Sequence, residues 1–168
     1  MRFFARIGTV LVLSAPPFCA QAEECGRDAF AAVVQETGVS LSAMNEANKR
    51  SFHEKLQQLK ARNGWSDSDY VAKATPFIQD ERIAAFDAEN SALLAKVPQL
   101  GAGAQNTQSL ASVAPAIGGP GDRHCEMLAE LRALMAKTVE NTQAKWSYML
   151  GKLDGALNAA PQTHAADR

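Results

Sequence analysis

The stretch that most constrains the fold is Asp122–Ala160, a long helical pattern that carries Cys125 near its start. Apolar side chains recur along it at steps of three, four or seven residues, which is the spacing of one face of an α-helix. These positions are Leu128, Leu131, Met135, Val139, Trp146, Met149, Leu153 and Leu157. The pattern predicts a helix from about Arg123 to Asn158 with Asp122 as its N-cap, although Thr138–Lys145 in the middle is polar.

The N-terminus predicts export. Met1–Arg6 contains two arginines and no acid, Ile7–Leu13 is apolar, and the A-Q-A run at 20–22 places small residues where signal peptidase reads the chain. We therefore expect residues 1–22 to be a cleaved signal peptide and the protein to be periplasmic or secreted. A membrane anchor is the alternative, but the apolar run is much shorter than the roughly 20 residues that cross a bilayer.

Removing the signal peptide from the 168-residue chain leaves 146 residues, an ordinary length for one domain. The signal holds two of the 17 basic residues and none of the 18 acidic ones, so the mature chain has a formal charge of −3. Because no strongly basic region remains to bind phosphates, we expect no nucleic-acid partner. We also expect no transmembrane segment after cleavage, because no other stretch is apolar over a sufficient length.

The mature chain keeps two cysteines, Cys25 and Cys125, because Cys19 lies in the predicted signal peptide. Two cysteines in an oxidising compartment most simply form one disulfide. Such a bond closes a loop of about 100 residues, which stabilises the fold by roughly 4–5 kcal/mol in the chain-entropy description. A redox-active or metal-binding pair is the alternative, but the chain has no C-x-x-C motif. We predict a structural disulfide between Cys25 and Cys125.

The first helical segment is predicted over Cys25–Arg62. Its repeating positions are Phe30, Val34, Thr37, Leu41, Met44, Asn48, Phe52, Leu56 and Leu59, at steps of three and four. Gly38 is a candidate break, with Ser40 as a new N-cap, yet the stripe keeps its phase across it. The sequence therefore leaves one helix and two collinear helices both open. Asn63-Gly64 is expected to end the segment, with Gly64 in the left-handed conformation.

The second segment is predicted over Ser66–Val97, with Ser66 or Asp67 as its cap. We expect Thr75-Pro76 to interrupt it, because proline lacks an N–H and suits the first position of a new helix. Pro98 is expected to close the segment.

Residues 98–121 differ sharply in composition, since they hold five glycines and no charge, which is typical of a flexible linker. A short turn after the first segment and a long linker before the last one predict three segments that run up, down and up. That order places both cysteines at the same end. We therefore predict an all-α bundle of three long helical segments in one domain, 23–160, followed by a disordered tail, 161–168.

Few residues point to chemistry. Three adjacent residues, His124, Cys125 and Glu126, are metal-ligand types, but neighbours on a helix point in different directions. Four acids, Asp80, Glu81, Asp87 and Glu89, form a candidate pair of catalytic carboxylates, although a solvated helix face explains them more simply. His53-Glu54 is expected on the surface and His164 in the tail.

No motif fixes a reaction: the chain contains no G-x-S-x-G, S-x-x-K or C-x-x-C-H. We therefore predict no catalytic residue, no metal site and no cofactor. The favoured function is non-catalytic binding of a protein or envelope component. One alternative is a small-ligand carrier with a pocket between helices near Trp146, and another is an enzyme that uses Asp80 and Asp87, or His124. Trp65, Tyr70 and Tyr148 are the other aromatic residues that a site is able to use, with core packing as the default.

Overall fold

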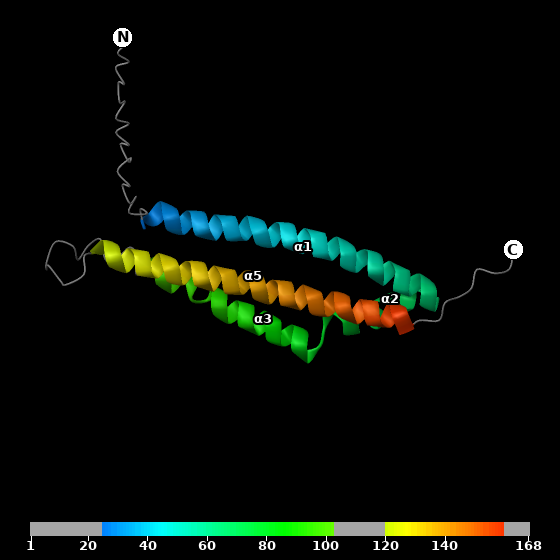
Figure 1. The fold of residues 1–168 in the computed structure, drawn as a ribbon. Helices are drawn as coiled ribbons and strands as arrows, with labels where there is room; N and C mark the ends of the chain where they lie inside the picture. The colour runs from blue at the N-terminus through cyan, green and yellow to red at the C-terminus, as the bar shows by residue number, and fades with distance from the viewer. Residues whose placement is uncertain (1–24, 103–119, 160–168) are drawn as a thin grey trace, which may run out of the picture.

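The computed structural model describes residues 25–102 and 120–159, and in these ranges all regular structure is helical (Figure 1). The helices are α1 (Arg27–Asn63), α2 (Asp67–Ile78), α3 (Glu81–Leu94) and α5 (Pro120–Ala159). A short helical stretch at 97–102 follows α3. In Figure 1, α1 runs in one direction, α2 and α3 return, and α5 runs beside α1 in its direction. The predicted all-α, up-down-up arrangement is thus confirmed. The predicted signal peptide, the linker at 103–119 and the predicted tail lie outside the described residues.

α1 is a single helix of 37 residues that passes through Gly38 without a break. Its C-terminal cap is the predicted one: Gly64 has φ 60° and ψ 36°, in the left-handed region that glycine adopts without a steric cost. The N–H groups of Gly64 and Trp65 donate to the carbonyl oxygens of Ala61 (3.3 Å) and Lys60 (3.0 Å). These bonds satisfy carbonyl oxygens in the last turn of the helix, which have no N–H partner within the helix.

α2 begins as predicted, with Ser66 as its N-cap: the Ser66 hydroxyl accepts a hydrogen bond from the N–H of Asp69 at 3.2 Å. An ion pair between Lys60 and Asp67 joins the last turn of α1 to the first turn of α2. The short turn between these helices is therefore bridged by an ion pair and followed by a capping hydrogen bond.

The predicted break at Thr75-Pro76 is wrong, because α2 continues through Pro76 to Ile78. The Thr75 hydroxyl does not cap a helix but donates to the carbonyl of Val71 at 2.8 Å. Proline is tolerated here because the helix ends two residues later, so little of the hydrogen-bond ladder is lost. The break falls instead before α3, where Asp80 is the N-cap and its Oδ1 accepts from the N–H of Ile83 at 2.8 Å.

Two further boundaries differ from the prediction. α3 ends at Leu94, and Pro98 lies inside the helical stretch at 97–102, which the sequence assigned from residue 98 onward to a linker. α5 begins at Pro120, so Asp122 lies inside the helix rather than at its cap. Proline favours the first helical position, because its φ suits a helix and its missing N–H has no intrahelical partner there.

The last helix is the element on which the bundle is assembled. α1, α2 and α3 each pack against α5, whereas α1 and α3 make little direct contact with each other within the described residues (Figure 1). None of the helices in the described part of the chain has both the length and the apolar character that crossing a membrane requires.

The buried apolar side chains form two clusters along α5. We call the first the closed half: it consists of Phe52, Leu56, Leu59, Ala74, Ile83, Met149, Leu153 and Leu157. We call the second the disulfide half: it consists of Phe30, Leu93, Leu128, Leu131, Leu134 and Met135. The closed half draws on α1, α2, α3 and α5 together, whereas the disulfide half takes one residue each from α1 and α3 and the rest from α5.

Candidate functional site

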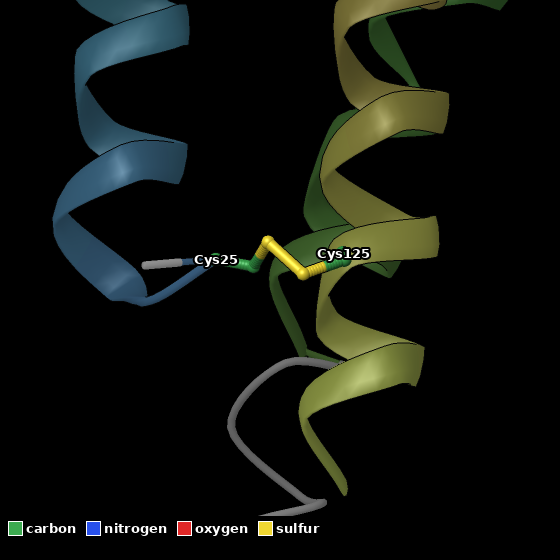
Figure 2. Close-up of a disulfide and its surroundings, with 2 residues drawn as sticks. All are labelled: Cys25 and Cys125. Atoms are coloured by element: carbon green, nitrogen blue, oxygen red, sulfur yellow. A yellow bond between two sulfur atoms is a disulfide. The ribbon is translucent and has the colours of Figure 1, made fainter. Parts of the chain in front are cut away.

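The predicted disulfide is present between Cys25, which precedes α1, and Cys125, near the start of α5 (Figure 2). The two Cα atoms are 4.9 Å apart although 100 positions separate the residues in sequence. The bond holds the first turn of α1 beside the beginning of α5, as Figure 2 shows. The disulfide half of the bundle therefore has a covalent connection at its end.

An apolar groove opens beside this disulfide, between α1 and the chain at 94–101. It consists of two adjoining hollows that share Val34 and Val97. The hollow next to the disulfide has a volume of about 280 Å³ and is lined by Cys25, Gly26, Arg27, Phe30, Ala31, Val34, Val97, Gly101, His124 and Leu131. The second hollow has a volume of about 330 Å³ and is lined by Val34, Thr37, Gly38, Leu41, Leu94, Val97, Pro98 and Met135. We call the two together the groove.

The groove exists because α1 lacks a close neighbour on one side in this part of the bundle. Between Phe30 and Phe52, no residue of α1 is fully buried, although the apolar stripe continues through the interval. Val34 is 43% exposed on one wall and Leu94 is 48% exposed on the other. Exposed apolar side chains that face one another across a hollow are typical of binding surfaces.

Gly38 lines the groove, and nothing in the described structure requires glycine there. Its backbone is helical, and a Cβ atom built on it meets no other atom within 4 Å. Glycine inside a helix costs about 0.5–1 kcal/mol relative to alanine. The position therefore leaves open space in the wall of the groove at a cost in helix stability.

Charge in the groove is confined to its disulfide end. Arg27 is the one permanently charged residue among the described lining residues, and no carboxylate joins it there. The Arg27 side chain is exposed and has no hydrogen bond or ion pair within residues 25–102 and 120–159. Gly26, the N-cap of α1, supplies no side-chain cap, so the positive end of the helix dipole lies at the same place.

Asp80 is the centre of a polar cluster on the other side of α5. Its Oδ2 accepts hydrogen bonds from the Tyr148 hydroxyl at 2.9 Å and from Lys152 Nζ at 2.5 Å. The bond from Lys152, followed by that from the N–H of Ile83, lowers the pKa of Asp80 to about 2. The same carboxylate raises the pKa of Tyr148 through their hydrogen bond. The bonds from Tyr148 and Lys152 join the start of α3 to α5, whereas the bond from Ile83 caps α3.

The acids considered as catalytic carboxylates do not gather. Asp87 pairs with Lys145, and Glu89 pairs with Lys137 at 3.4 Å. Asp80 and Asp87 thus have different lysine partners on α5, two turns apart. The expectation that these acids lie on a solvated face is met for Asp87 and Glu89, which are exposed, whereas Asp80 is partly buried in its cap.

A polar layer separates the closed half from the disulfide half. The Asn141 amide donates to the carbonyl of Phe86 and to Oδ1 of Asn90, both at 2.9 Å, and the Asn90 amide donates to the Thr142 hydroxyl at 3.1 Å. The Thr138 hydroxyl is bonded within α5. No buried side-chain nitrogen or oxygen of the described residues lacks a partner. The polar middle of α5, which weakened its sequence pattern, is therefore a satisfied network against α3.

The tryptophan and tyrosine residues considered for a site pack against the closed half. Trp146 meets Phe52 edge to face at 6.3 Å between ring centroids, and its indole N–H donates to Oδ1 of Asn45 at 2.7 Å. Trp65 and Tyr70 also pack against that cluster. The described lining of the groove does not include Trp146, near which one alternative interpretation of the sequence placed a pocket.

The residues with metal-ligand side chains do not form a centre. Within residues 25–102 and 120–159, no three histidine, cysteine or acidic residues lie close enough to hold an ion together. Cys125 is consumed by the disulfide, and His53 and Glu54 are exposed on α1. His164 lies outside the described residues.

No protein-family description matches the sequence, and neither the curated proteins nor the solved structures contain a match. Argument about function therefore rests on the groove and its chemistry.

The sequence analysis missed the groove. Its two walls are more than 50 residues apart in the chain, and one of them extends into the stretch interpreted as a linker. The one signal that pointed to it was Gly38, a glycine inside an apolar stripe that keeps its phase.

Proposed function

We propose that this protein is an exported, non-catalytic binding protein that holds an elongated, apolar small molecule in the groove. The observation that carries the proposal is the groove itself: α1 displays an apolar stripe over several turns between Phe30 and Phe52 that the other described elements cover only in part. Leaving such side chains exposed costs hydrophobic free energy that a ligand recovers on binding.

The dimensions of the groove favour a small molecule over a protein helix. Small-molecule pockets have volumes of about 300–1,000 Å³, and the two hollows together fall in that range. An α-helix with its side chains is about 10–12 Å across and needs a wider surface with charged residues along both edges. The single charge of the lining, at one end, does not supply such edges.

The distribution of titratable groups supports a non-catalytic role. The carboxylate of Asp80, whose pKa is lowered to about 2, caps a helix and does not line the groove. Asp80 is held by three donors and is already engaged as a structural acceptor. No general acid or base pair lies at the walls where a ligand is proposed to bind.

Export is supported by the signal-like N-terminus and by the disulfide, a bond that persists in oxidising compartments. The test is mass spectrometry of the protein recovered from the periplasm or medium, with and without alkylation. We expect a chain that begins at Glu23, with both thiols oxidised. Full-length protein confined to the cytoplasm contradicts this part of the proposal.

Ligand binding is tested with Nile red, a neutral apolar dye whose fluorescence rises in an apolar site. We expect saturable binding to the folded chain and a loss of at least tenfold in affinity for Gly38→Trp, which fills the groove. Gly151→Trp is the matched control, because Gly151 is also inside a helix with no atom within 4 Å of an added Cβ. The control is expected to bind the dye as the unchanged protein does.

Three results overturn the proposal. Dye binding that Gly38→Trp leaves unchanged places the site elsewhere, and absence of saturable binding removes it. A dimer that Gly38→Trp converts to a monomer, measured by sedimentation, makes the groove an interface between two copies. In each case, equal melting temperatures of the two tryptophan variants show that folding is not the cause.

A further inference from the structure

We propose, on the basis of the proposed function, that the ligand is a single-chain amphiphile with an anionic head group. Its head lies at Arg27, beside the disulfide, and its hydrocarbon tail runs along α1 toward Leu41. The chemical class is that of a fatty acid or another amphiphile with one acyl or alkyl chain. The two parts of the proposal, the sign of the head group and the direction of the chain, rest on separate observations.

The head group is assigned by charge. Among the described residues, Arg27 is the only permanently charged one that lines the groove, it is exposed, and none of the others forms an ion pair with it. An anion is therefore favoured over a cation at this end, and the first N–H groups of α1 favour it further. Asp28 is the nearest acid along α1, but it does not line the groove. A charge at one end and none in the remainder match an amphiphile.

The tail is assigned by length and polarity. From Arg27 to Leu41 the wall follows α1 for 14 residues, which is roughly 20 Å at the rise of an α-helix. An extended hydrocarbon advances about 1.3 Å for each carbon–carbon bond of about 1.5 Å, so roughly 12–16 carbons span the groove. Beyond the Arg27 end, the wall is formed mainly by Phe30, Val34 and Leu41, with Thr37 as the one polar residue on α1.

The sign of the head group is tested by displacement of Nile red at low ionic strength. Dodecanoate and dodecyltrimethylammonium have the same chain with opposite charges, and both are used below the concentrations at which they form micelles. We expect dodecanoate to bind about three- to tenfold more tightly, because an exposed ion pair contributes modestly and a like charge opposes binding. The preference is expected to shrink in 0.5 M salt.

The matched variants are Arg27→Gln and Arg50→Gln. Both remove one positive charge from an exposed position of α1, and Arg50 does not line the groove. We expect Arg27→Gln to reduce the preference for dodecanoate below twofold and Arg50→Gln to leave it unchanged. Equal affinity of the two amphiphiles, or equal effects of the two variants, overturns the anionic head group. If Nile red still binds when either of these results is obtained, the proposed function stands and only the assignment of the head group is wrong.

The direction of the chain is tested by fluorescence quenching with 12-bromododecanoate, which carries the heavy atom at the end of its tail. Reporters are introduced by Ala31→Trp and Leu41→Trp, at the two ends of the groove. The emission of Trp65 and Trp146, which pack in the closed half, is subtracted using the parent protein. Stronger quenching in the Leu41→Trp variant supports the proposed direction. Equal or reversed quenching overturns it.

Discussion

The closed half and the disulfide half share α1 and α5, but only in the closed half is the apolar stripe of α1 well buried. In the closed half, Leu59 of α1 is 1% exposed and Leu153 of α5 is 0% exposed, because α2 and α3 contribute Ala74 and Ile83 to the same cluster. In the disulfide half, Val34 occupies an equivalent place in the apolar stripe of α1 but is 43% exposed. An amphipathic stripe thus predicts which face of a helix points toward the core. Whether that face is buried depends on further helices, here α2 and α3, that pack beside the first two.

The two halves are also stabilised in different ways. The closed half relies on apolar packing and on polar fastenings such as the bond from Arg62 to the carbonyl of Leu157 at 3.0 Å. The disulfide half, with fewer neighbours for α1, has a covalent bond at its end. The cross-link supplies stability at the end of the bundle where the packing around α1 is incomplete.

The largest effect is expected from removing that cross-link. Replacing Cys25 and Cys125 together by serine should lower the free energy of unfolding by about 4–5 kcal/mol in the chain-entropy description. Urea unfolding measures the loss, and hydrogen exchange locates it: amides at 28–41 should exchange faster than those at 52–59. A reducing agent should have no further effect on the double variant. Equal acceleration in both stretches contradicts the proposed division into two halves.

The next largest effect is a cavity in the closed half. Leu153→Ala should cost about 3 kcal/mol, within the range of about 2–5 kcal/mol for a buried leucine, because the side chain is fully enclosed. Leu94→Ala is the control in the groove wall, where 48% exposure limits the loss to about 0.5 kcal/mol. Similar losses for the two variants, measured by urea unfolding, imply that the groove wall is buried in solution.

The polar layer between the halves should matter at an intermediate level. Asn141→Ala removes the donor to Oδ1 of Asn90 and to the Phe86 carbonyl, and we expect a loss of about 1–3 kcal/mol. A double-mutant cycle with Asn90→Ala measures the coupling between the two side chains. Additive losses indicate that the two amides do not interact in solution.

Replacing the glycine in the groove wall and the glycine that caps α1 by alanine should change the stability of the protein in opposite directions. Gly38→Ala is expected to stabilise the protein by about 0.5–1 kcal/mol, because it improves helix propensity and the added Cβ meets no atom. Gly64→Ala should destabilise it by about 1–2 kcal/mol, since an L side chain is strained at φ 60°. Thermal unfolding distinguishes the signs. A destabilised Gly38→Ala variant indicates that another group approaches Gly38 closely in solution.

The smallest expected effect is the dependence of stability on pH that arises from Asp80. The pKa of Asp80 is about 2, below its ordinary value of 3.8, so its bonds stabilise the fold fully above about pH 4 and are lost as the pH falls through 2. Asp80→Asn should remove this part of the acid dependence, seen in urea unfolding between pH 2 and 5. The variant should also lower the pKa of Tyr148, which the carboxylate raises. An unchanged acid profile contradicts the assigned bonds.

Much of the fold follows from local chemistry that the sequence displays. The stripe of α1 and the left-handed cap at Gly64 need only residue spacing and glycine's freedom at positive φ. The Cys25–Cys125 bond and the up-down-up order follow from counting cysteines and comparing loop lengths. These inferences succeed because each depends on a few neighbouring residues or on a single topological condition.

The features that were not predicted depend on tertiary contacts. Pro76 stays inside α2 because the cap at Asp80, fastened to α5 by Tyr148 and Lys152, fixes where the next helix begins. The polar middle of α5 is stable because Asn90 of α3 lies opposite Asn141. The groove depends on a gap between walls that are far apart in sequence. None of these is encoded in the periodicity of one segment.

The central position of α5 has a consequence for synthesis, because this helix is made after α1, α2 and α3. α1 packs chiefly against α5, and Cys25 waits for Cys125, which follows 100 residues later. A nascent chain that ends before α5 lacks the main partner of the apolar face of α1, so the native contacts between these two helices form only after α5 has been made. Topology thus delays the native packing of α1 until a helix that lies far along the chain has been synthesised.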